Sequence, residues 1–241
     1  MTDSPPLMNV TDAELDDLRS RLRNTRWPTA WPTEGWAAGT EPGELRRLVA
    51  YWADGYDWRT HEAAVNALPS HFADIDGTPV HYLRFDGESP GALPIVLTHG
   101  WPSSVLELAG LARRLATPSQ FGGAAEDAFT VIVPSVPGFA FSPQRPVLDG
   151  LPTHEIWHRL LHDHLGFERY GAHGGDLGSG ITSRLAAATP RRWRASTCWR
   201  SPTPPDTTRR ASPRRSRCTS MPSPPGPPTR AATCTSSRPG R

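Results

Sequence analysis

The sequence predicts an α/β fold, a mostly parallel sheet flanked by helices, with a helical region before it and a disordered tail after it. Three observations support this prediction. Residues 11–26, 43–54 and 57–68 repeat apolar residues at helical spacing. From about residue 71, short β-type runs alternate with helical stretches, an alternation typical of parallel sheets. After residue 189 the composition becomes too polar to form a core.

Local signals place the individual elements. Thr11 is a good N-cap for the first helix, and Glu14, three residues later, completes a capping box. Asp76-Gly77 lies between two β-type runs and predicts a tight hairpin turn within residues 71–85. Beyond the hairpin, we expect strands near 93–100, 129–138 and 169–173, alternating with helices near 103–116, 151–166 and a last one that ends near 188.

Charge divides the 241-residue chain into unlike parts. Residues 1–189 carry 14 Arg against 23 Asp and Glu, whereas residues 190–241 carry 12 Arg against a single acid, and Lys is absent. Residues 190–241 also hold 16 Ser and Thr and 11 Pro, but no Leu, Ile, Val or Phe. We therefore predict three parts: a helical N-terminal region with the first hairpin (1–92), a partial α/β core (93–189) and a disordered tail (190–241).

The tail has two interpretations. An Arg-rich arm can bind nucleic acid through the phosphates. Alternatively, a chain with Arg and no Lys is typical of a GC-rich gene, and such a gene read out of frame yields Arg, Pro, Ser and Thr. On this second hypothesis the reading frame is lost near residues 189–194, so the in-frame sequence is truncated there. The strand near 169–173 would then be an exposed sheet edge.

Membrane and secretion signals are missing from the printed sequence. No run of 18 apolar residues occurs, and the acidic start MTDSPPLMNVTDAELDD lacks an apolar stretch. We therefore expect no membrane partner and a cytoplasmic location.

The clearest chemical signal is Gly174-Gly175-Asp176-Leu177-Gly178. It matches the strand–turn–helix nucleophile elbow, with glycines two residues before and after the nucleophile and Asp in the place of Ser. A Gly-rich turn with Asp as a helix N-cap fits the same five residues. His99-Gly100-Trp101-Pro102 follows an earlier strand, where hydrolases of this fold place a second oxyanion donor. We expect His99 to shape this turn and not to transfer protons.

Five stretches of the chain carry a family resemblance. They are LRSRLRNTRWP (18–28), YDWRTHEAAVNALPSHFADIDGTPVHYLRF (56–85), LTHGWPSS (97–104), VIVPSVPGFAFS (131–142) and RYGAHGGDLGS (169–179), and they run through nearly all of residues 10–189. On these stretches the chain resembles the microsomal-type epoxide hydrolases of the α/β-hydrolase superfamily. The N-terminal helices correspond to the N-terminal domain peculiar to that family.

The resemblance implies an incomplete α/β-hydrolase fold and the hydrolysis of epoxides to vicinal diols, without a cofactor. Asp176 would attack a small-molecule epoxide and form an ester, and the backbone N–H groups of Trp101 and Leu177 would hold the oxyanion when water attacks that ester. A haloalkane dehalogenase-like activity also uses an Asp nucleophile on this fold, but the N-terminal match argues against it.

The chain departs from the family pattern after the nucleophile. This fold supplies nucleophile, acid and His in that order. None of the nine histidines follows Asp176, the only later acid is Asp206, and the last Tyr is Tyr170, so the tyrosines that would polarise the epoxide oxygen are missing. We therefore expect the chain to be inactive, or to react once with an epoxide without turnover.

A competing motif is His154-Glu155-Ile156-Trp157-His158, which matches the zinc-binding pattern H-E-x-x-H. It opens an amphipathic helix, and no clear third ligand follows, although His162 continues the spacing. We interpret it as a His-rich surface stripe and expect no metal.

Overall fold

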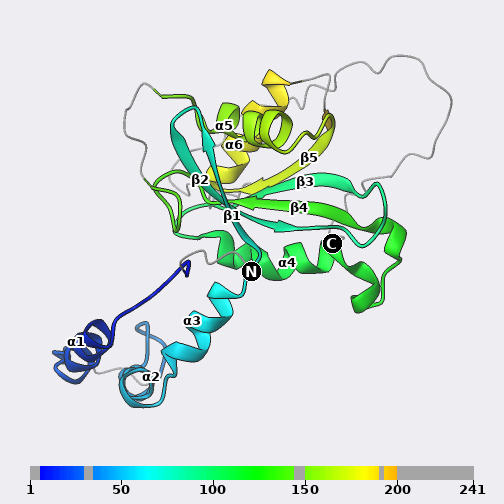
Figure 1. The fold of residues 1–241 in the computed structure, drawn as a ribbon. Helices are drawn as coiled ribbons and strands as arrows, with labels where there is room; N and C mark the ends of the chain where they lie inside the picture. The colour runs from blue at the N-terminus through cyan, green and yellow to red at the C-terminus, as the bar shows by residue number, and fades with distance from the viewer. Residues whose placement is uncertain (1–5, 30–34, 144–149, 190–192, 200–241) are drawn as a thin grey trace, which may run out of the picture. The chain divides into compact units, whose positions relative to one another are not determined.

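The structure is a computed structural model and describes residues 6–29, 35–143, 150–189 and 193–199. Helices and strands alternate from the hairpin onward, as the sequence predicts (Figure 1). In chain order the elements are α1 (Asp12–Arg23), α2 (Pro42–Asp54), α3 (Trp58–Asn66), β1 (Ser70–Ile75), β2 (Thr78–Phe85), β3 (Leu93–Thr98), α4 (Val105–Ala116), the 3-10 turns η1 (Pro118–Phe121) and η2 (Ala125–Asp127), β4 (Phe129–Pro134), α5 (Thr153–Arg159), the π-helical turn η3 (Leu160–His164), β5 (Tyr170–Gly175), α6 (Leu177–Ala188) and β6 (Trp193–Trp199).

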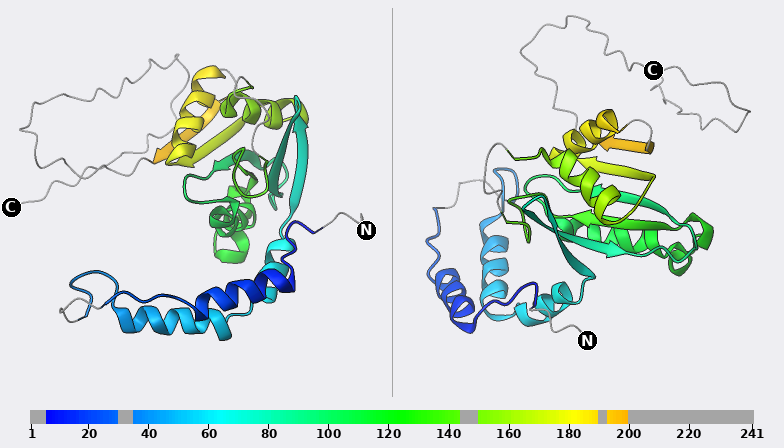
Figure 2. Two further views of the ribbon diagram at one scale, coloured as in Figure 1. Left: turned by 90° about the vertical axis from the view of Figure 1, so that its left-hand side faces the viewer. Right: turned by 45° about the horizontal axis from the view of Figure 1, so that its top comes forward.

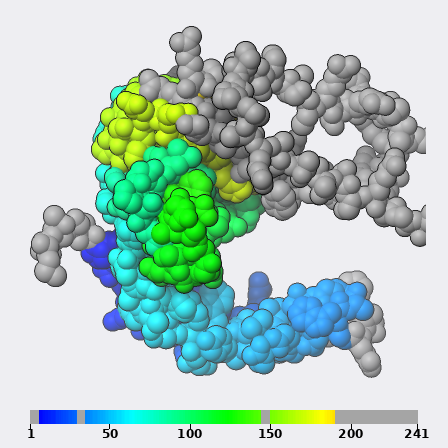
Figure 3. Space-filling view, turned by 90° about the vertical axis from the view of Figure 1, so that its right-hand side faces the viewer, coloured from blue at the N-terminus to red at the C-terminus, as the bar shows by residue number. Residues whose placement is uncertain are grey.

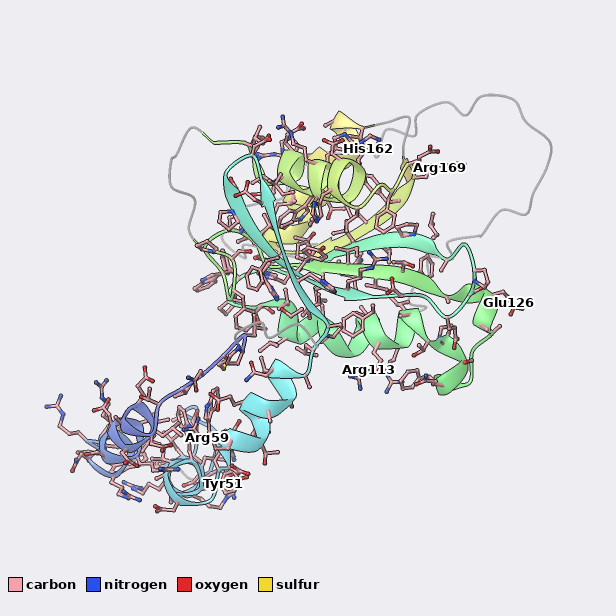
Figure 4. All side chains as sticks on the ribbon, viewed as in Figure 1. Tyr51, Arg59, Arg113, Glu126, His162 and Arg169 are labelled. Atoms are coloured by element: carbon pink, nitrogen blue, oxygen red, sulfur yellow. The ribbon has the colours of Figure 1, made fainter. Side chains whose placement is uncertain are left out.

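The N-terminal helices are held by caps and ion pairs. The Thr11 hydroxyl accepts a hydrogen bond from the Glu14 amide, and the Glu14 carboxylate accepts one from the Thr11 amide at 2.8 Å, so the predicted capping box is present. Arg59 of α3, labelled in Figure 4, pairs with Glu62 at 2.6 Å and with Asp12 at 2.5 Å. Arg59 thereby ties α3 to the start of α1.

The sheet has six strands in the order β1-β2-β4-β3-β5-β6. Strand β2 pairs antiparallel with β1 and β4, and β4, β3, β5 and β6 run parallel. The β1–β2 hairpin turns at Asp76, whose φ is 51°, and the Gly77 amide donates to the Asp74 carboxylate at 2.7 Å. The predicted hairpin and the parallel sheet are therefore both observed.

Helices cover both faces of the sheet, with α5 and α6 on one face and α4 on the other (Figures 1 and 2). Neighbouring strand residues alternate between the two faces: Val96 packs into the core cluster under α5 and α6, and Leu97 packs into the cluster under α4. The turns η1 and η2 follow α4 and lie, in green, on the face that Figure 3 shows. This layering leaves the carboxyl ends of β3 and β5 side by side.

Trp157 fastens α5 to the sheet. Its side chain is fully buried, and its indole N–H donates to the Thr98 hydroxyl of β3 at 3.1 Å. The sequence predicts one helix over 151–166, but the helix changes to the π-helical turn η3 after Arg159. His162 of this turn is labelled in Figure 4.

The prediction of a disordered tail from residue 190 is wrong at Trp193–Trp199, which form β6. The backbone of β6 pairs in parallel with β5, so β5 is an inner strand and not the sheet edge expected on the out-of-frame hypothesis. Backbone pairing requires no apolar side chain, and composition therefore did not reveal this strand. Residues 190–192 and 200–241 of the predicted tail lie outside the described residues.

Within the described part of the chain, no helix combines the length and the apolar character that a bilayer-spanning segment requires.

His81 on β2 makes the stability of the fold depend on pH. Its side chain is fully buried, with ring nitrogens 2.9 Å from the Ser135 hydroxyl and 2.7 Å from the Ser70 hydroxyl, and burial lowers its pKa from 6.5 to about 4. Between these two values the unfolded chain binds a proton that the folded chain does not. This group therefore stabilises the fold above pH 6.5 and lowers its stability as the pH falls toward 4.

We expect the free energy of unfolding to fall by up to about 1.4 kcal/mol per pH unit through this group. Urea unfolding at several pH values between 7 and 4 measures the slope for the wild type and for His81→Gln. The variant should have the shallower slope, whatever its stability at neutral pH. Equal slopes of the free energy of unfolding against pH in the two proteins would show that a group other than His81 causes the pH dependence.

Candidate active site

Asp176 occupies the turn between β5 and α6. Its φ of 50° and ψ of −119° are unusual for a residue other than glycine, and such a backbone costs on the order of 1–3 kcal/mol. The side chain is exposed at the carboxyl end of β5. Asp176 therefore lies at a strand-to-helix corner of the kind that the glycine pattern predicts.

Three glycines allow the backbones around this corner to approach closely. A Cβ atom on Gly174 would lie 2.7 Å from the Thr182 hydroxyl and would also collide with the Gly178 backbone. A Cβ on Gly178 would collide with the carbonyl oxygen of Thr98 on β3. A Cβ on Gly100 would lie 2.6 Å from the Cβ of Asp176. The turn at Asp176, the start of α6 and the turn after β3 therefore approach so closely that no side chain fits at these three glycines.

Two backbone amides face the Asp176 carboxylate. The Trp101 N–H donates to Asp176 Oδ1 at 2.9 Å. The hydrogen bonds from the amides of Trp101 and Leu177 hold the pKa of this carboxyl below its usual value, since they stabilise the charged form. The structure thus brings together the three residues that the sequence analysis selected. Trp101 and Leu177 are 69% and 48% exposed, and each donates a backbone N–H to the carboxylate.

Both ring nitrogens of His99, in the turn after β3, contact backbone groups. Its ring is buried, Nε2 accepts a hydrogen bond from the Val136 amide at 3.1 Å, and Nδ1 lies 3.0 Å from the Gly100 carbonyl oxygen. These contacts fit a neutral ring with its proton on Nδ1, and burial lowers its pKa accordingly. Because both ring nitrogens are engaged, His99 positions the Gly100–Trp101 turn and is not available as a base.

Asp176 lines two cavities. One has a volume of about 460 Å³ and is also lined by Glu107 of α4 and His173 of β5. The other has a volume of about 680 Å³ and runs along α6 as far as Ser183 and Arg184. The carboxylate is thus accessible from two sides.

Family comparisons agree with this geometry. Residues 4–108 match the family described as epoxide hydrolase N terminus, and residues 94–216 match the α/β-hydrolase fold family. A protein of Stigmatella aurantiaca that bears the name "Putative epoxide hydrolase" is 42% identical over 190 residues, which cover 78% of this chain and 43% of the relative. The chain belongs to the epoxide hydrolases of the α/β-hydrolase family.

Solved epoxide hydrolases have the same fold. The Aspergillus niger epoxide hydrolase superimposes with a TM-score of 0.63 at 29% identity, over 81% of this chain and 52% of that one. The juvenile hormone epoxide hydrolase of the silkworm Bombyx mori has a TM-score of 0.63 at 27% identity, over 79% and 51% of the two chains. The chain spans less than half the length of the curated relatives it matches.

Three charged or titratable residues that line the cavities at Asp176 were not predicted from the sequence: Glu107, His173 and Arg184. Glu107 stands in the first turn of α4, and its carboxylate accepts a hydrogen bond from the Ser103 hydroxyl. The position of Arg184, two helical turns after Asp176, was the available signal. Glu107 and Arg184 belong to no motif, and His173 lies in the stretch RYGAHGGDLGS (169–179), where no role was predicted for it.

The His-Glu-x-x-His stretch lies on α5. His158 Nδ1 lies 2.8 Å from the Tyr170 hydroxyl, and its ring stacks on that of His162 with centroids 5.3 Å apart. Among the residues that the structure describes, no three His, Cys, Asp or Glu side chains are grouped as metal ligands.

Proposed function

We propose that the chain opens epoxides by attack of the Asp176 carboxylate on an epoxide carbon. The observation that carries this proposal is the exposed Asp176 side chain at the strand-to-helix corner, with the Trp101 amide 2.9 Å from Oδ1. Attack on a saturated carbon requires a nucleophile that is already an anion, and the two amides keep this carboxyl ionised.

The first step forms an ester. With Oδ1 held by the Trp101 amide, Oδ2 attacks the epoxide carbon, and the carbon–oxygen bond of the ring breaks. The electron pair of that bond stays on the epoxide oxygen, which takes a proton from solvent water. Oδ1 then becomes the carbonyl oxygen of the ester, and it already faces a donor that would hold an oxyanion.

The second step, attack of water on this ester, requires a base. This fold supplies that base as a His after the nucleophile, and none of the nine histidines of the printed sequence follows Asp176. His99, which precedes it, is engaged through both ring nitrogens. We therefore propose that the chain as printed forms the ester and releases diol slowly or not at all.

Mass spectrometry with styrene oxide tests this proposal. We expect one adduct per chain, located by peptide mapping to Asp176, and no sustained production of diol. Adducts distributed over histidine or cysteine side chains, with Asp176 unmodified, would overturn the assignment of the nucleophile. Steady production of diol would overturn the proposed block in the second step.

The rate of adduct formation should be insensitive to pH through the usual carboxyl range. Because the amides of Trp101 and Leu177 lower the pKa of Asp176 below its ordinary value of 3.8, the carboxylate stays ionised when free carboxylates protonate. We expect the rate of modification by styrene oxide to decline only below pH 3.8, with circular dichroism used to confirm that the chain is folded at each pH. A decline centred above that value would contradict the proposed stabilisation by these amides.

A further inference from the structure

The larger cavity beside Asp176 carries a positive charge at its far end. Arg184 follows Asp176 by eight residues on α6, which places their Cα atoms about 12 Å apart along the helix axis. Long helical side chains point back toward the N-terminus of their helix, so the Arg184 stem extends toward Asp176 over the preceding turn. Both residues line the same cavity of about 680 Å³.

Small residues of α6 line this cavity between Asp176 and Arg184. Gly180 lies one turn before Arg184, and a Cβ atom at Gly180 would have no neighbour within 4 Å. The Ser179 hydroxyl donates to the Asp176 carbonyl oxygen at 2.7 Å, and the Ser183 hydroxyl donates to the Ser179 carbonyl oxygen at 2.8 Å. These three residues of α6 have small side chains or none, which leaves space for a short chain of carbon atoms.

No carboxylate of the described residues neutralises Arg184. Asp176 is the only acidic residue among those described that line the cavity. The ion pairs found within the described ranges engage other arginines. The cavity therefore has a nucleophilic carboxylate at one end and an exposed guanidinium at the other, with space for a ligand between them.

We propose that the groove along α6 selects epoxides that carry a carboxylate, with Arg184 binding the carboxylate and Asp176 attacking the epoxide carbon. Guanidinium and carboxylate are matched in charge and in hydrogen-bonding geometry. The anionic group stays at the Arg184 end, away from the negative charge of Asp176. The covalent step is the ester formation described above, so this inference rests on the proposed function.

Two matched pairs of compounds test the inference. The reactive pair is epoxyhexanoate with a terminal epoxide and its neutral primary amide, and the readout is the rate of ester formation at Asp176. The unreactive pair is the corresponding dihydroxyhexanoate and its amide, and the readout is binding followed by NMR titration. The second pair measures recognition of the carboxylate even if no ester forms.

We expect the wild type to favour both carboxylates over their amides by about three- to fivefold, the scale of an exposed ion pair. Arg184→Gln should abolish this preference for both pairs of compounds. Arg169→Gln, which removes an arginine outside this cavity (labelled in Figure 4), should retain the preference.

The outcomes separate this inference from the proposed function. If the neutral epoxide modifies Asp176 and Arg184→Gln changes nothing, the inference fails and the proposed function stands. If neither epoxide reacts but the dihydroxy carboxylate binds through Arg184, the proposed function fails and anion recognition stands. An equal loss for carboxylate and amide in Arg184→Gln would reveal a structural role and overturn the inference.

Discussion

Asp176→Asn should abolish modification of the chain by styrene oxide. The Asn side chain keeps an Oδ1 that can accept from the Trp101 amide, so the corner between β5 and α6 should be retained. A neutral amide is a poor nucleophile toward saturated carbon. We therefore expect the rate of adduct formation to fall by at least about 1000-fold, the scale on which enzymes lose rate when the nucleophile is removed.

Asp163→Asn is the matched control. Asp163 is also an exposed carboxylate with a lowered pKa, but the cause is its hydrogen bond to His162 on η3, and no backbone corner presents it. The control should be modified at the wild-type rate. If both variants lose modification equally, the reaction requires overall charge and not the carboxylate at the elbow. If Asp176→Asn is modified like the wild type, another residue is the nucleophile.

Local patterns predicted the elements of this fold well where one short segment determines the structure. The Thr11–Glu14 capping box and the Asp76-Gly77 turn are examples, because each depends on hydrogen bonds or backbone angles within a few residues. The elbow at Asp176 belongs with them. Its glycines are needed for contacts within the strand–turn–helix unit and for contact with the neighbouring strand β3.

Features that depend on partners distant in sequence were not predictable. Strand β6 forms through backbone pairing with β5, and a polar composition hides such a strand. Leu48 and Trp52 have the spacing of a buried helix face, yet both are exposed on α2 in the structure. The sequence spacing gave the helix correctly, but it contains no information about what covers the helix.

The residues of the candidate site likewise fall into those that the sequence predicted and those that only the structure revealed. Asp176, Trp101 and Leu177 lie in recognisable motifs and were predicted from the sequence. Arg184 belongs to no motif, and its relation to Asp176 appears only once the helix fixes the direction of its side chain and the cavity joins the two residues.

Gly178→Ala should have the largest effect on stability. The new Cβ would meet the backbone carbonyl oxygens of Thr98 and His99, and backbone atoms of a central strand cannot move aside without shifting β3 against α6. Overpacking of this kind costs about 1–3 kcal/mol, and we expect the upper end because both contacts are with backbone. Urea unfolding measures the loss, and adduct formation at Asp176 should slow as the Trp101 amide moves away.

Gly180→Ala supplies a control on the same helix, two residues further along. Its Cβ would have open space, and alanine favours the helix by about 0.5–1 kcal/mol over glycine. The two substitutions are chemically identical, so helix propensity alone predicts stabilisation in both. Opposite signs would locate the difference in the contact between Gly178 and β3. If Gly178→Ala is also stabilising, α6 does not approach β3 at backbone distance, and the geometry that aims Asp176 at the Trp101 amide would have to be abandoned.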